Sequence, residues 1–84
     1  KLAPDALLLI APGCPHCGTN LAALTVLVKE DVIGRLEVVN IASHPEVAQQ
    51  VGVRSVPWLR LGPFELAGAR TETELRGWAE QVRQ

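Results

Sequence analysis

Two cysteines separated by two residues carry the strongest chemical signal in the chain. Cys14 and Cys17 lie in the run Gly-Cys-Pro-His-Cys, residues 13–17, and no other cysteine is present. Side chains three positions apart at the start of a helix lie about one turn from each other, so the two sulfurs can reach disulfide distance. A bridge over so short a loop restrains little of the unfolded chain, so we do not expect it to serve stability. The spacing predicts a redox-active dithiol.

The two cysteines are expected to play different parts. Pro15 suits the first turn of a helix, which places Cys14 at the N-terminus of that helix, where unpaired N–H groups and the helix dipole favour a thiolate. The thiolate is the nucleophile, so Cys14 is the predicted attacking residue, and Cys17, one turn further along, is the predicted resolving residue. His16, if protonated or donating its N–H, would stabilise the Cys14 thiolate and make the disulfide more oxidising; otherwise it is a solvated residue.

Short apolar runs predict the first elements that must position these side chains. The run Ala-Leu-Leu-Leu-Ile at residues 6–10 is apolar on every side, which is typical of a central strand covered on both faces. A helix is expected over residues 15–30, and only Thr25 interrupts its apolar part, so we expect it to be largely buried. The β-branched residues at 35–41 predict a second strand.

Two pairs of polar residues have the spacing of capping boxes, in which a Ser or Thr N-cap is followed three residues later by Glu. Ser43 and Glu46 predict the start of a second helix, and Gly52 predicts its end. Thr71 and Glu74 predict the start of a third helix, whose apolar residues then recur at helical spacing.

A hairpin completes the expected order of elements. The runs at residues 58–61 and 64–67 are separated by a Gly-Pro turn and read as two antiparallel strands. The order is therefore β-α-β-α-β-β-α, and the strand–helix–strand unit at its start implies a parallel crossover. We predict an α/β fold with a four-stranded mixed sheet flanked by helices, forming a single domain over residues 1–84.

Composition limits the kinds of partner. The chain has 84 residues, of which 48% are hydrophobic and 20% charged, as is typical of globular proteins. Its eight basic residues are scattered and its net charge is −1, which argues against a basic face for nucleic acid. No apolar run is long enough to span a membrane. The chain begins at Lys1 and contains no Met, so we interpret it as a processed form, an excised domain or a trimmed chain.

This order of elements resembles the thioredoxin superfamily in a small, glutaredoxin-sized form. The motifs that carry the resemblance are Cys-Pro-His-Cys, the segment 40–57, and the Gly-Ala break before the last helix. The resemblance implies a cis-proline at Pro57 that faces the cysteines, and at Val56 a residue whose backbone pairs with the substrate peptide. It also implies that Gly68 and Trp58 contribute to substrate binding, although Trp58 is also interpreted as a core residue.

The chain departs from thioredoxins proper at two positions near the cysteines. Leu8 matches the buried carboxylate of the first strand, and Val38 matches the lysine that accompanies it. In thioredoxins the carboxylate assists proton transfer at the buried cysteine. Without it, water or His16 could serve as the proton acceptor.

The sequence therefore predicts a thiol–disulfide oxidoreductase that exchanges disulfides with protein partners and with an upstream dithiol donor or acceptor. The resemblance implies no cofactor and no metal, and a monomer is expected. The net direction of exchange stays open, because the potential sets it. A Cys-x-x-Cys pair works in either redox compartment, and the cytoplasm is favoured over the periplasm.

Four alternatives stay open beside this prediction. A glutaredoxin-like, glutathione-dependent reductase would normally carry Gly-Gly-x-x-Asp where this chain has residues 68–72, although Thr71 could still offer N–H groups. A redox-inert binding module of the same fold often lacks one cysteine. A zinc site needs four ligands, and His16 and His44 are too far apart for the usual spacing. An iron–sulfur cluster bridging two chains through Cys14 would need a dimer.

Overall fold

The elements follow one another in the predicted order. The computed structural model describes residues 3–83, and no helix in that range is long and apolar enough to cross a membrane. The elements are β1 (Ala6–Ile10), α1 (Cys17–Lys29), β2 (Leu36–Asn40), α2 (Pro45–Val51), β3 (Trp58–Leu61), β4 (Phe64–Ala67) and α3 (Glu72–Arg83). This order and the mixed sheet described below confirm the predicted fold class.

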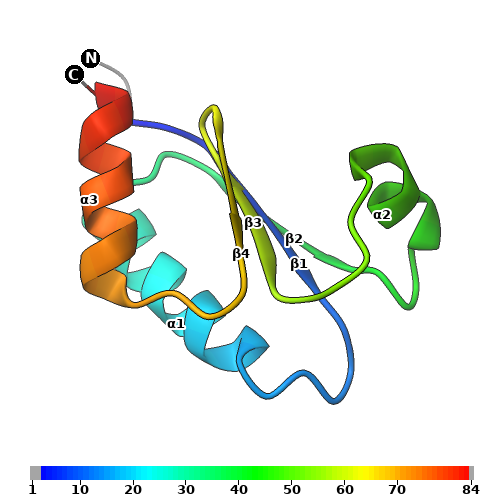
Figure 1. Ribbon diagram of the computed structural model, residues 1–84. Coiled ribbons are helices and arrows are strands. Elements are labelled where there is room, and N and C mark those ends of the chain that lie inside the picture. The colour runs from blue at the N-terminus through cyan, green and yellow to red at the C-terminus, as the bar shows by residue number, and fades with distance from the viewer. Residues whose placement is uncertain (1–2, 84) are drawn as a thin grey trace.

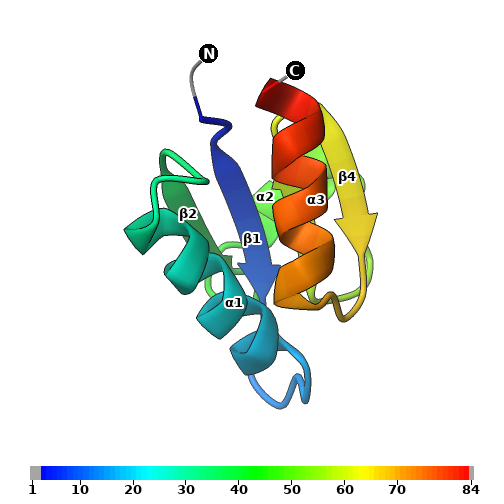
Figure 2. The same ribbon diagram turned by 90° about the vertical axis from the view of Figure 1, so that its left-hand side faces the viewer.

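The four strands form one mixed sheet in the order β2-β1-β3-β4. β1 pairs in parallel with β2 and antiparallel with β3, and β4 pairs antiparallel with β3. Helices α1 and α3 cover one face of this sheet, and the short α2 lies on the other side (Figures 1 and 2). The apolar sequence of β1 fits its position inside the sheet, since Leu8 and Leu9, which point to opposite faces, are both fully buried, whereas Leu7 is half-buried.

The main core fills the space between the sheet and the two helices α1 and α3. Leu8 and Leu59, which are cross-strand partners, are both fully buried on this face. The next pair along the same strands, Leu9 and Trp58, points to the opposite face because side chains alternate along a strand. The core cluster consists of Ala6, Leu8, Ala23, Leu24, Leu27, Ile33, Leu59, Leu61, Leu66, Leu75 and Ala79.

The two predicted capping boxes have different outcomes. At the start of α3 the box is present: the N–H of Glu74 donates to Thr71 Oγ1 at 3.1 Å, and the N–H of Thr71 donates to Glu74 Oε1 at 3.3 Å. The predicted Ser43–Glu46 box is wrong, because α2 has His44 as its N-cap and no side-chain cap bond.

The turn after β2 explains why the second box does not form. The Asn40 side chain accepts the N–H of Ala42 at 2.9 Å, and the Asn40 carbonyl accepts the N–H groups of Ser43 and His44. Ser43 is thus a turn residue, and the carboxylate of Glu46 lies 3.5 Å from the His44 ring instead. The predicted end of this helix is confirmed, since Gly52 adopts a left-handed φ of 78°.

Helix α1 is one-sided, which corrects the expectation that it would be largely buried. Ala22 and Thr25 are exposed, although Ala22 belongs to the apolar run. The buried residues are Cys17, Asn20, Ala23, Leu24 and Leu27. Only one stripe of the helix is fully buried, with Leu21 and Val28 half-buried at its edges, and one polar residue, Asn20, lies within that stripe.

Candidate redox site

The cysteine pair lies where β1 leads into α1, at the C-terminal end of the central strand. Cys14 and Cys17 are joined by a disulfide, with their Cα atoms 5.5 Å apart. Cys14 is half-buried, whereas only 6% of Cys17 is exposed. An attacking thiol must be reached by a partner and a resolving thiol need only reach its neighbour, so these exposures fit the two predicted roles.

Helix α1 begins later than predicted. Cys17 is its first residue and His16 its N-cap, with the carbonyl of His16 accepting the N–H of Asn20 at 3.1 Å. The expectation that Pro15 opens the helix and that Cys14 lies at its N-terminus was therefore wrong. Cys14 lies in the preceding turn instead.

Backbone geometry explains this turn and changes the electrostatic argument. Gly13 has a φ of +77°, which side-chain-bearing residues rarely adopt, and the N–H of Cys14 donates back to the carbonyl of Ala11 at 3.4 Å. The chain thus reverses before the helix starts. Because the helix dipole acts mainly within the first turn, its effect on a Cys14 thiolate is smaller than the sequence suggested.

The segment before β3 lies at the same end of the sheet as the cysteine loop. Leu9, near the end of β1, pairs with Trp58, the first residue of β3. The peptide bond between Val56 and Pro57 is cis, and Pro57 is buried. Within residues 3–83, no backbone hydrogen bond engages the N–H or the C=O of Val56, which is half-buried. The Val56 backbone is therefore not engaged by the sheet or the neighbouring turns within this range.

Trp58, by contrast, is mainly a packing residue. Only 7% of it is exposed, and the Arg60 guanidinium lies 5.5 Å from its ring centroid on the same face of the sheet. Its ring therefore packs on the face of the sheet opposite to α1 and α3, and little of it can contact a substrate.

Gly68 connects the segment before β3 to helix α1, which begins at Cys17. Its N–H donates to the carbonyl of Pro57 at 2.9 Å, and its own carbonyl accepts Asn20 Nδ2 at 3.1 Å. Its φ of +80° explains why glycine occupies this position.

Asn20 was not identified as a buried residue from the sequence, although its position on the helix indicates burial. It shares one face of α1 with Cys17, Leu24 and Leu27, at positions where an apolar residue is expected.

Two N–H groups at the start of α3 are already bonded to side chains of the same segment. Thr71 and Glu74 satisfy each other as described above, and the guanidinium of Arg70 contacts Glu74 Oε2 at 3.3 Å. A carboxylate of the protein itself thus lies at the N–H groups that could otherwise hold an external carboxylate.

No Asp, Glu, His, Lys or Arg side chain is buried in the described range, where Asn20 is the one buried polar residue. Leu8, in the middle of β1, is fully buried, and its β2 partner Val38 is 39% exposed. The inner cysteine therefore has no buried carboxylate to take its proton. Among residues 3–83 there is also no group of three or more His, Cys, Asp or Glu side chains that could hold a metal ion.

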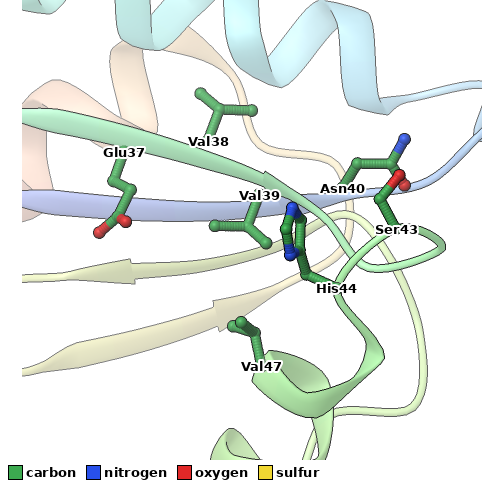
Figure 3. A pocket seen from close by; sticks show the side chains of 7 residues that line it. All are labelled: Glu37, Val38, Val39, Asn40, Ser43, His44 and Val47. Atoms are coloured by element: carbon green, nitrogen blue, oxygen red, sulfur yellow. The ribbon is translucent and has the colours of Figure 1, made fainter.

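A surface groove of about 510 Å³ lies elsewhere, along β2 and the start of α2 (Figure 3). His44, which was interpreted as a surface residue without function, is exposed beside it. The lining residues are Glu37, Val38, Val39, Asn40, Ser43, His44 and Val47. None of them is a cysteine or belongs to the Val56–Pro57 segment, so this groove is separate from the redox pair.

Comparison with known proteins places this arrangement in context. The family described as Thioredoxin domain matches residues 6–80. No curated protein sequence matches the chain. Among solved structures, a mutant thioredoxin from Halobacterium salinarum is similar with a TM-score of 0.86 at 19% identity, covering 99% of this chain and 77% of that one.

Two further structures share the fold. The J-Trx1 fragment of ERdj5 is similar with a TM-score of 0.76 at 24% identity, over 95% of this chain and 41% of that one. A malarial protein is similar with a TM-score of 0.78 at 20% identity, over 94% of this chain and 96% of that one. At these identities the likeness concerns the fold alone.

Proposed function

The chain belongs to the thioredoxin family, and on that basis we propose that it is a thiol–disulfide oxidoreductase acting on protein partners. The observation that carries the proposal is the Cys14–Cys17 disulfide, with one cysteine accessible and the other buried. Both cysteines needed for the exchange are thus present and close together, which a redox-inert module would not require.

In the reducing direction the exchange takes two steps. The Cys14 thiolate attacks one sulfur of a partner disulfide, forming a mixed disulfide and releasing the partner's other sulfur as a thiolate. The Cys17 thiol then loses its proton and attacks the Cys14 sulfur, which forms the intramolecular disulfide and releases the second partner thiolate. The protein has given up two electrons, and a donor dithiol restores them by the reverse sequence.

Proton transfer at Cys17 relies on groups outside the core. The absence of a buried Asp, Glu, His or Lys side chain among residues 3–83 supports water or the exposed His16 as the acceptor. The partner's backbone is proposed to pair with Val56 beside Pro57, which is supported by the unengaged N–H and C=O of Val56 in the described range.

The alternative functions have less support. Glu74 and Arg70 surround the start of α3, so a glutathione carboxylate would compete there with a carboxylate of the protein itself. A zinc site finds no ligand cluster among residues 3–83.

The direct test is reduction of insulin disulfides with dithiothreitol as electron donor. We expect the protein at micromolar concentration to accelerate insulin precipitation well above the rate with dithiothreitol alone. Replacing dithiothreitol by glutathione should give much less acceleration. A rate equal to that with dithiothreitol alone contradicts the proposed function, and faster turnover with glutathione would favour the glutaredoxin alternative.

His16 is expected to set the potential of the pair. Replacing it by Pro removes the group proposed to stabilise the Cys14 thiolate, so the reduced form loses stability and the potential becomes more reducing, by about 30 mV for each 1.4 kcal/mol lost. Equilibration with a glutathione buffer measures this shift. His44→Ala, which alters an exposed histidine outside the cysteine loop, is the control. An unchanged or more oxidising potential in His16→Pro would show that the histidine does not act in this way.

A further inference from the structure

Asn20 is the one fully buried polar side chain among residues 3–83, and both ends of its amide are bonded to distant backbone. Its Nδ2 donates to the carbonyl of Gly68 at 3.1 Å, and its Oδ1 accepts the N–H of Arg70 at 3.0 Å. These partners stand 48 and 50 positions further along the chain. The amide therefore joins α1 to the loop between β4 and α3.

The loop held by Asn20 in turn holds the segment before β3. The N–H of Gly68 donates to the carbonyl of Pro57 at 2.9 Å, so a single residue is bonded to Asn20 on one side and to Pro57 on the other. Asn20 lies one helical turn after Cys17 on the same face of α1. A short path therefore runs from the buried cysteine through Asn20 and Gly68 to Pro57.

An amide is a costly choice for this position if packing alone were needed. Asn has a lower helix propensity than Leu, and burying an amide is favourable only when its hydrogen bonds are made. Asn20 is nevertheless buried among apolar residues such as Leu24 and Leu27, which occupy the same face of the helix. A satisfied buried polar group instead specifies one relative placement of the elements that it joins.

We propose that Asn20 is a positioning residue that keeps the peptide-docking backbone at Val56 and Pro57 in register with the two cysteines. This role rests on the proposed function. Its substrate is an extended polypeptide disulfide, which must contact both the cysteines and the backbone at Val56 and Pro57. Small disulfides need only reach the Cys14 sulfur. Asn20 thus contributes to binding of protein substrates and leaves the exchange between sulfurs unaffected.

The test uses Asn20→Leu, which keeps the size of the side chain and removes both hydrogen bonds. The KM for insulin should rise about tenfold with kcat little changed, the result of losing interactions worth about as much as one or two hydrogen bonds. The rate with a small aromatic disulfide and the equilibrium constant with glutathione should each stay within about twofold of wild type. Thr25→Ala, which removes the exposed 2.8 Å bond to Leu21 on the same helix, should leave the KM for insulin unchanged.

A second variant keeps the proposal testable if Leu does not fold at this position. Asn20→Ala removes the same two bonds with a smaller side chain, and circular dichroism checks that each variant is folded. In either variant the Gly68 N–H, bonded to Pro57, should exchange with deuterium faster than in Thr25→Ala.

The outcomes separate the positioning role from the function on which it rests. If insulin and the small disulfide lose rate by the same factor, or if neither is affected, Asn20 does not position the docking backbone, whereas the proposed function stands. If the wild-type protein does not reduce insulin, the proposed function is wrong and the positioning role with it.

Discussion

Replacing Cys14 by Ser should reduce the rate of insulin reduction to that of dithiothreitol alone, because no other thiol can begin the exchange. Cys17→Ser should also stop turnover, but after the first step: Cys14 still attacks, and the mixed disulfide then has no resolving thiol. The two variants thus lose the same activity for different reasons. The buried position of Cys17, 6% exposed, accounts for the difference, since a partner disulfide reaches the outer cysteine first.

Covalent trapping distinguishes the two roles. Cys17→Ser incubated with a protein disulfide should form a complex that survives denaturing electrophoresis and disappears on addition of dithiothreitol. Peptide mapping of that complex should show the bond at Cys14. A stable complex formed instead by Cys14→Ser through Cys17 would reverse the assignment of attacking and resolving residues.

Leu59→Ala should lower the free energy of unfolding by about 2–5 kcal/mol, the range for removing a fully buried leucine side chain from a packed core. Leu59 is 0% exposed on β3 and faces the layer between the sheet and helices α1 and α3. For a domain of this size the total stability is on the order of 4–13 kcal/mol, so this single change removes a large share of it.

Urea unfolding followed by circular dichroism measures the effect, with the disulfide state held the same for every variant. Val38→Ala is the matched control, since Val38 is an apolar strand residue that is 39% exposed, and it should change the free energy of unfolding by less than about 0.5 kcal/mol. Equal losses in the two variants would contradict the central place assigned to Leu59 in the core.

The predictions that the structure bears out depend on local patterns. The apolar run of β1, the hairpin at β3 and β4, and the box of Thr71 and Glu74 each depend on residues within a few positions of one another. The end of α2 at Gly52 is of the same kind. Local backbone geometry and side-chain periodicity are properties of short segments, so the sequence carries them.

The predictions that failed concern competition between local patterns. Ser43 and Glu46 have the spacing of a capping box, but Asn40 forms a tighter turn just before them and leaves Ser43 outside the helix. Pro15 is suited to open a helix, yet the turn built around Gly13 delays the start of α1 to Cys17. In each case two local signals overlap, and the surrounding chain selects between them.

The reactive groups can be identified without the structure: two cysteines separated by two residues, in a chain whose elements follow the order of a thioredoxin-like fold. Tertiary structure alone decided which cysteine is buried, which side of α1 faces the core, and that Asn20 reaches Gly68 and Arg70. Burial and contacts between positions some 50 residues apart exist only once the sheet has assembled. The reactive groups can be identified from their spacing along the chain, whereas their burial and their neighbours depend on long-range packing.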